Sequence, residues 1–231
     1  LRQRYELEQL KVVLRIWHKK IPLILQEHLI AERISFAIDY KKIVLAQSIE
    51  EIILLLEATP YKAPLLKAKD RFKEKNSTFY LEAALDLDYY RRLNQAIETF
   101  SRPDRKVASR ILGVEIVIEN INWLIRLRKY YALGMAEMLE WVIPGGQWVD
   151  KEAVRYFYAS DGSGKAAENV YLGPYIRLKE LLQENVSLIE NFLYAFLARE
   201  VKKALSGFPF TIGTVLGYLI LKHRESKNII S

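Results

Sequence analysis

The chain has 231 residues, 51% of them hydrophobic, so it can bury a substantial core and is too apolar to be disordered. Its 35 Lys and Arg against 28 Asp and Glu give a formal net charge of +7 with the two signs interspersed, which favours a partner with an acidic face over a nucleic-acid-binding arm. The absence of cysteine excludes disulfides, thiolate zinc sites and cysteine catalysis, and suits a reducing compartment.

The first predicted element is an amphipathic helix at the start of the chain. Its apolar side chains step by three and four positions: Leu7, Leu10, Leu14, Trp17 and Ile21. Because the sequence opens at Leu1 inside this pattern, without a methionine or a leader, we expect it to be a fragment or the ordered part of a longer protein.

The next predicted helix begins at a capping box and ends at a proline. The Ser48 hydroxyl can accept an N3 amide while Glu51 returns to the Ser48 amide, starting a helix that runs through Leu56. Thr59-Pro60 then stops it, because proline disfavours helix in the residue before it. Gly173-Pro174 is the matching break further along.

Turn residues predict three loops, in the stretches Ser101 to Asp104, Ile143 to Gly146 and Ser160 to Gly164. Between them, apolar side chains follow helical spacing at Val114, Val117, Ile118, Ile121, Leu124 and Ile125. Little strict alternation occurs anywhere, so the pattern predicts an all-helical protein.

The longest apolar stretch runs from Phe208 to Leu221 and is interrupted by Pro209, Gly213 and Gly217. A helix needs about 20 apolar residues to cross a bilayer, so this run is too short and too broken to do so. We expect a buried helix, not a membrane anchor.

One pattern occurs twice, 108 residues apart. Tyr80-Leu-Glu82-Ala-Ala-Leu85 recurs as Leu188-Ile-Glu190-Asn-Phe-Leu193, and each glutamate is followed 38 residues later by an asparagine, Asn120 or Asn228. A partial third copy stands first, because the segment around Arg4 and Gln9 aligns with that around Glu115 and Asn120 at an offset of 111. Such a register indicates repeated structural units.

The repeat predicts the organisation of the chain. Residues 1–33 would be the last helix or helices of repeat unit one, residues 34–142 repeat unit two, and residues 143–231 repeat unit three. Glu82, Asn120, Glu190, Glu225 and Asn228 are then structural positions of the repeat, and the Asn120 amide can bind the loop of a neighbouring helix pair. Arg126 falls on the face opposite the apolar stripe, so Arg126, Arg128, Lys222 and Arg224 are the candidates for binding a partner.

Two apparent sites fail on chemistry. Asp161-Gly-Ser-Gly164-Lys165 resembles a phosphate-binding loop, but Ala159 stands where the leading glycine belongs and Ala166 where a magnesium-holding hydroxyl belongs. His18, His28 and His223 lack the paired spacing of a metal site. We therefore expect no cofactor, no metal and no catalytic residue.

Several motifs resemble the C-subunit family of V-type ATPases and ATP synthases, equivalent to the eukaryotic V-ATPase d subunit. They are Leu56-Glu57-Ala-Thr59-Pro-Tyr61, the helix carrying Glu115, Ile116, Asn120 and Arg126, the Ile143-Pro-Gly-Gly146 loop, and the closing Tyr218, Lys222, Glu225, Asn228 series. Two positions depart from the family pattern. Val117 replaces an acidic residue, and Gln9 replaces the asparagine in repeat unit one.

The resemblance implies a funnel-like array of three similar helical units with pseudo-threefold symmetry, the first unit incomplete in this chain. It implies a non-catalytic rotor adaptor of a rotary ATPase, cytoplasmic and peripheral to the membrane. Its partners would be central stalk subunits of D and F type and the membrane rotor ring of c/K-type proteolipid, without nucleic acid. The alternative is a basic helical-repeat protein that binds nucleic acid, which would gather Lys and Arg on one face with exposed aromatics. An enzyme ranks third.

Overall fold

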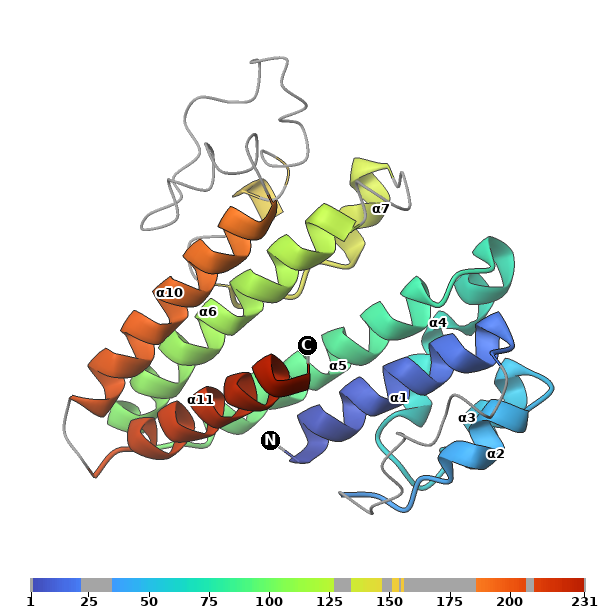
Figure 1. Ribbon diagram of the computed structural model, residues 1–231, viewed down its shortest axis with the longest axis horizontal. Helices are drawn as coiled ribbons and strands as arrows, with labels where there is room; N and C mark the ends of the chain where they lie inside the picture. Colours follow the sequence, from blue (N-terminus) through green and yellow to red (C-terminus); the bar gives the residue numbers. More distant parts are fainter. Residues whose placement is uncertain are drawn as a thin grey trace. The chain divides into compact units, whose positions relative to one another are not determined.

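A computed structural model describes residues 2–21, 35–126, 134–146, 151–153, 155, 186–206 and 210–230, with the side chains of 125, 126, 186, 187, 190 and 223–230 left out. The described part is all-helical, as the sequence predicted (Figure 1). Its helices are α1 (Arg2–Lys19), α2 (Tyr40–Leu45), α3 (Ile49–Leu55), α4 (Lys62–Lys75), α5 (Phe79–Glu98), α6 (Arg102–Arg126), α7 (Met135–Glu140), α10 (Val186–Leu205) and α11 (Ile212–Ile230).

The chain divides into two compact units, Leu1–Tyr89 and Tyr90–Ser231, called here the N-terminal and C-terminal units and described separately. In the N-terminal unit, α1 buries the predicted apolar stripe, with Leu7, Leu10 and Leu14 at most 1% exposed. It packs against α2, and α3 packs against α2 and α4. The first half of α5 belongs to the same core, because Phe79, Tyr80 and Leu81 are all at most 2% exposed.

The start of α3 corrects part of the predicted capping box. The Ser48 hydroxyl accepts the Glu51 N–H at 3.3 Å, as predicted, but the Glu51 carboxylate accepts the N–H of Gln47 at 2.7 Å, one residue before the expected partner. Helix α3 ends at Leu55, with Leu56 as its C-cap. The turn that follows is held by the Thr59 hydroxyl, which donates to the Leu56 carbonyl and accepts the Tyr61 N–H.

The C-terminal unit is built on α6, α10 and α11, which pack against one another (Figure 1). Two glycines allow α11 to lie close to its neighbours. A Cβ added to Gly213 would stand 2.7 Å from Val107 Cγ1 on α6, and one added to Gly217 would stand 3.1 Å from Val201 Cγ1 on α10. Large side chains at these two positions would therefore push α11 away from the other two helices.

The predicted loop at Ser101 to Asp104 is wrong in extent, because α6 already begins at Arg102. The Ser101 hydroxyl donates to the Asp104 carboxylate at 2.8 Å and accepts its N–H at 3.4 Å, so Ser101 caps the helix. Pro103 fits the first turn, where its missing N–H would have no helical partner.

Helix bounds follow the sequence repeat. Adding the 108-residue offset to α5 gives 187 to 206, against the observed Val186–Leu205, and adding it to the start of α6 gives 210, against Ile212.

The prediction that the Phe208 to Leu221 stretch is buried is wrong for one face. Gly213 and Gly217 are buried, but Val215 is 53% and Tyr218 62% exposed.

Candidate functional site

The predicted site residues fall into two groups. Glu82, Asn120 and Lys222 are described with their side chains, and Lys222 is exposed on α11. Arg126, Glu190, Arg224, Glu225 and Asn228 lie in described helices, but their side chains are outside the description, and Arg128 is outside it altogether. The glycine-rich stretch from Asp161 to Lys165 and His28 also lie outside the described residues.

Asn120 joins α6 to the Pro-Gly-Gly loop that follows α7. Its side chain is 4% exposed, donates to the Ile143 carbonyl at 2.9 Å and accepts the Ile143 N–H at 2.8 Å. The Asn120 amide thus hydrogen-bonds both the N–H and the carbonyl of the buried Ile143. Few other side chains can both donate and accept in this way.

A second asparagine supports the same loop. Asn94 on α5 donates to the Pro144 carbonyl at 3.4 Å. Gly145 has a φ of +95°, a conformation that other residues rarely adopt, and an added Cβ would stand 3.1 Å from Asn94 Nδ2. The loop therefore has one fixed path across α5 and α6.

Charged residues connect α1 to α5 in the N-terminal unit. Lys11 Nζ lies 2.9 Å from Asp86 Oδ1, and both side chains are less than 10% exposed. One turn further along α1, Arg15 Nε lies 3.7 Å from Glu82 Oε1. Because a buried charge without a partner is costly, these pairs fix which faces of the two helices meet.

Glu6 is a buried carboxylate that sequence reasoning missed as a functional position. It is 1% exposed and accepts the N–H groups of Ser35 and Phe36 at 2.8 and 2.9 Å and the Tyr61 hydroxyl at 2.9 Å. Burial and the nearby Glu6 charge raise the pKa of Tyr40 well above its ordinary value.

The signal for Glu6 was present in the sequence. Gln9 stands where the family pattern has an asparagine. Glu6 lies three residues earlier, at the position where that pattern has an acidic residue. Tyr61 closes the Leu56 to Tyr61 motif, so two segments that the resemblance singled out meet in one hydrogen bond.

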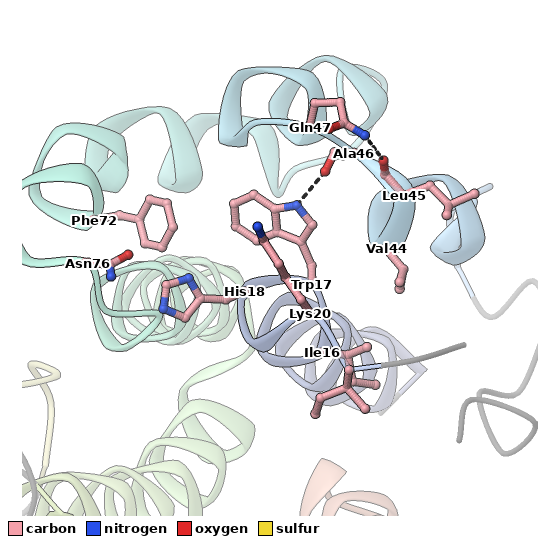
Figure 2. A pocket seen from close by; sticks show the side chains of 11 residues that line it. Ile16, Trp17, His18, Lys20, Val44, Leu45, Ala46, Gln47, Phe72 and Asn76 are labelled. Atoms are coloured by element: carbon pink, nitrogen blue, oxygen red, sulfur yellow. Dashed lines mark hydrogen bonds between the residues drawn. The ribbon is translucent and has the colours of Figure 1, made fainter. Parts of the chain in front are cut away.

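The N-terminal unit also carries a groove of about 800 Å³ beside the end of α1 (Figure 2). The Trp17 indole forms part of its wall and donates to the Ala46 carbonyl at 2.7 Å. The Phe72 ring lies 5.6 Å from that of Trp17 and 5.4 Å from that of His18, edge-on to the latter. The groove is an aromatic-walled surface with Lys20 and His18 among its lining residues.

Within the described residues, no three His, Asp or Glu side chains gather in a way that could hold a metal ion. In the same part of the chain, no helix combines the length and apolar character that a bilayer crossing requires. What the described geometry provides is a set of buried polar contacts that join helices to one another and to a loop.

Comparison with known proteins gives a family match across residues 1–231, to the family described as ATP synthase (C/AC39) subunit. The chain belongs to this family. The C subunit of the A-type ATP synthase of Archaeoglobus fulgidus is 30% identical over 193 residues, covering 83% of the chain and 53% of the relative. The C subunit of the Methanosarcina acetivorans enzyme is 24% identical over 228 residues, covering 98% of the chain and 62% of the relative.

A third relative, the C subunit of the A-type ATP synthase of Methanosphaera stadtmanae, is 24% identical over 197 residues, covering 83% of the chain and 51% of the relative. The chain thus spans about half the length of the curated relatives that it matches. No solved structure matches it. Membership in the ATP synthase (C/AC39) subunit family agrees with the motifs at Leu56 to Tyr61, Asn120 and Ile143 to Gly146.

Proposed function

We propose that the chain is a non-catalytic adaptor in the rotor of an A/V-type ATP synthase. It would connect the central stalk to the membrane rotor ring and transmit torque between ATP hydrolysis or synthesis and ion transport. It would work on the cytoplasmic side, peripheral to the membrane. Family membership over the whole chain is the observation that carries this proposal.

The described contacts support a mechanical role. A part that transmits torque has to resist deformation, and close-packed helices do so because their interiors have low compressibility. The buried Lys11–Asp86 pair and the two Asn120–Ile143 hydrogen bonds add directional contacts that would break if the joined segments slid past one another. The funnel with pseudo-threefold symmetry and the partners of D, F and c/K type belong to this proposal.

Nucleic-acid binding is less well supported. A nucleic-acid groove needs basic side chains free to contact phosphates, whereas several described lysines and arginines are engaged by carboxylates. Examples are Lys62 with Glu57, Lys73 with Glu50 and Arg105 with Glu98.

The direct test is co-purification of the full polypeptide with candidate stalk proteins, followed by titration of the isolated protein with nucleic acid across a salt series. We expect the stalk proteins to co-elute and their binding to weaken with salt, because exposed charges are screened over about 10 Å at 0.1 M. Salt-dependent binding of nucleic acid, with no co-elution of stalk proteins, would favour the alternative function.

Arg126 and Arg128 are the residues we propose for the stalk contact. Replacing both by Glu is expected to weaken stalk binding by about 1–3 kcal/mol, the range for interfacial charge pairs, with unchanged helix content. The matched control is Lys67→Glu with Lys106→Glu, which changes the net charge equally at two positions that are exposed in the described part of the chain. Loss of fold with intact binding would show that the two arginines are structural.

A further inference from the structure

One end of the C-terminal unit gathers basic side chains from two helices. Helix α6 begins at this end and α10 finishes there, and the two helices pack against each other (Figure 1). The basic side chains are exposed and follow helical spacing, so they form one row on each helix. They are Arg102, Lys106 and Arg110 on α6, and Arg199, Lys202 and Lys203 on α10, and these six residues are called here the basic end.

A buried carboxylate joins the two rows. Glu200 is 4% exposed, pairs with Arg110, and accepts a hydrogen bond from Lys203 Nζ at 2.8 Å. Because Arg110 and Lys203 bind the same carboxylate, the row on α6 and the row on α10 lie side by side. Six basic residues around one carboxylate give these described residues a formal charge of +5, compared with +7 for the whole chain.

Part of this charge is not neutralised within the described residues. There, no carboxylate pairs with Arg102, Lys106 or Lys202. The carboxylates closest in sequence to the row on α6, Glu98 and Asp104, already bind other groups. The basic end therefore presents cations that can contact an anionic partner.

Apolar side chains are exposed at the same end. Leu205 is the last residue of α10 and is 37% exposed, and Phe210, just before α11, is 86% exposed. The start of α11 lies beside both other helices, because a Cβ added to Gly213 would stand 2.7 Å from Val107 and 3.4 Å from Ala204. Basic residues next to exposed phenylalanine and leucine are typical of surfaces that lie in a membrane interface.

We propose that the basic end, together with Leu205 and Phe210, binds the headgroups of anionic phospholipids at a membrane surface. The cations would contact lipid phosphates, and the two apolar side chains would enter the boundary between headgroups and acyl chains. This site is separate from the stalk contact proposed at Arg126 and Arg128, so the inference does not depend on the adaptor function.

Two other anionic partners fit the end less well. Single-stranded nucleic acid binds by stacking its bases on aromatic rings, and the exposed Leu205 offers no ring. An acidic protein would bind most tightly through an anchor side chain that fills a pocket, and the groove described above lies in the N-terminal unit. A lipid surface needs neither a row of rings nor a pocket.

Co-sedimentation of the full polypeptide with vesicles tests the proposal. Vesicles of phosphatidylglycerol and phosphatidylcholine in equal parts supply the anionic surface, and vesicles of phosphatidylcholine alone supply the neutral one. Lys106→Glu with Lys202→Glu reverses two charges of the basic end. The matched control, Lys41→Glu with Lys67→Glu, changes the net charge equally at two exposed positions of the N-terminal unit. Circular dichroism checks that each variant keeps its helix content.

At about 0.1 M salt, where charges attract over about 10 Å, the wild type and the control should bind the anionic vesicles and not the neutral ones. The variant with Lys106→Glu and Lys202→Glu should bind about tenfold or more weakly, because each basic residue near an anionic surface contributes about fivefold. Equal binding by this variant and the control would overturn the proposal. Equal binding of the wild type to the two kinds of vesicle would overturn it too.

A second measurement locates the contact. Because the sequence has no cysteine, Phe210→Cys can carry a polarity-sensitive fluorophore without background labelling. Its emission should shift to the blue on anionic vesicles, whereas that of a fluorophore on Lys67→Cys should not. Equal shifts at the two positions, or no shift at either, would contradict the proposed site. Tighter binding to a single-stranded oligonucleotide or to polyglutamate than to anionic vesicles would assign the end to another class of partner and also overturn the proposal.

Discussion

The carboxylate of Asp104 accepts a hydrogen bond of 2.7 Å from the backbone N–H of Ile212, and the two residues are separated by 108 positions, the period of the sequence repeat. Two positions that the sequence repeat predicts to be equivalent are thus bonded to each other directly. The first turn of α6 meets the first turn of α11, and an N–H group that has no partner within its own helix is satisfied across the boundary.

This contact should make the stability of the C-terminal unit depend on pH in the acidic range. The Ile212 N–H and then the Ser101 hydroxyl hold the pKa of Asp104 below its ordinary value. A carboxyl group with a depressed pKa stabilises the fold above the pKa of the unfolded chain, about 4, and loses that contribution as the pH falls through the folded-state pKa. The urea midpoint of the wild type should therefore exceed that of Asp104→Asn at pH 7, and the difference should shrink below about pH 4.

The control for this measurement is Asp70→Asn, because the Asp70 side chain is 89% exposed. Its midpoint should track that of the wild type at both pH values. A wild-type advantage over Asp104→Asn that persists unchanged in acid would show that the Asp104 charge contributes nothing to the bond with Ile212.

The two glycines of α11 should respond differently to alanine. In a helix interior alanine is favoured over glycine by about 1 kcal/mol, whereas overpacking a core costs about 1–3 kcal/mol. At Gly213 the new Cβ would stand 2.7 Å from the branched Val107 side chain, so overpacking should prevail and Gly213→Ala should lower the free energy of unfolding by about 1–2 kcal/mol.

At Gly217 the nearest atoms are 3.1 to 3.2 Å away, and the Leu205 side chain among them can rotate. Gly217→Ala should therefore change the free energy of unfolding by less than about 1 kcal/mol. Urea denaturation followed by circular dichroism measures both. Equal losses for the two variants would contradict the close approach of α11 to α6.

The sequence was sufficient for the helical class, because that class depends on the spacing of apolar residues along the chain. The sequence was insufficient for contacts between side chains that lie far apart along the chain. Lys11 is buried on α1 and pairs with Asp86, which lies 75 positions later in the sequence. No pattern in the sequence around Lys11 predicts that partner.

The repeat makes a prediction about another pair. Arg15 and Glu82 are an ion pair between α1 and α5, and the offsets of 111 and 108 carry them onto Arg126 and Glu190, on α6 and α10. If the interface is repeated, a double-mutant cycle with Arg126→Ala and Glu190→Ala should give a coupling free energy of about 0.5–3 kcal/mol, typical of residues in contact. The control cycle pairs Arg126→Ala with Glu98→Ala and should give additive effects, because Glu98 pairs with Arg105 near the other end of α6. Additivity in both cycles would leave Arg126 available for the stalk contact proposed above.

The Lys11–Asp86 pair should behave as a buried charge pair in the N-terminal unit. Lys11→Met removes the cation that Asp86 shares with Glu8 and should cost about 3–5 kcal/mol, the range for removing one partner of a buried ion pair. The double variant Lys11→Met with Asp86→Leu removes both charges and should recover much of that loss, since apolar replacements of a buried pair are often neutral or better. If the losses of Lys11→Met and Asp86→Leu, measured singly, add up to the loss of the double variant, the two residues are not a coupled pair.

The last prediction concerns the loop held by Asn120. Asn120→Leu has a similar volume but removes both the donor to the Ile143 carbonyl and the acceptor of its N–H, leaving two buried polar groups without partners. Each unsatisfied buried group costs about 1–3 kcal/mol, so the variant should lose about 2–6 kcal/mol of unfolding free energy. Asn94→Leu removes a single longer bond to Pro144, at 3.4 Å, and should lose less than about 1 kcal/mol. Native-state hydrogen exchange of the Ile143 amide measures this contact directly. The exchange should become faster in Asn120→Leu and stay slow in Asn94→Leu. If both variants exchange alike, the loop is held by packing and not by the Asn120 amide.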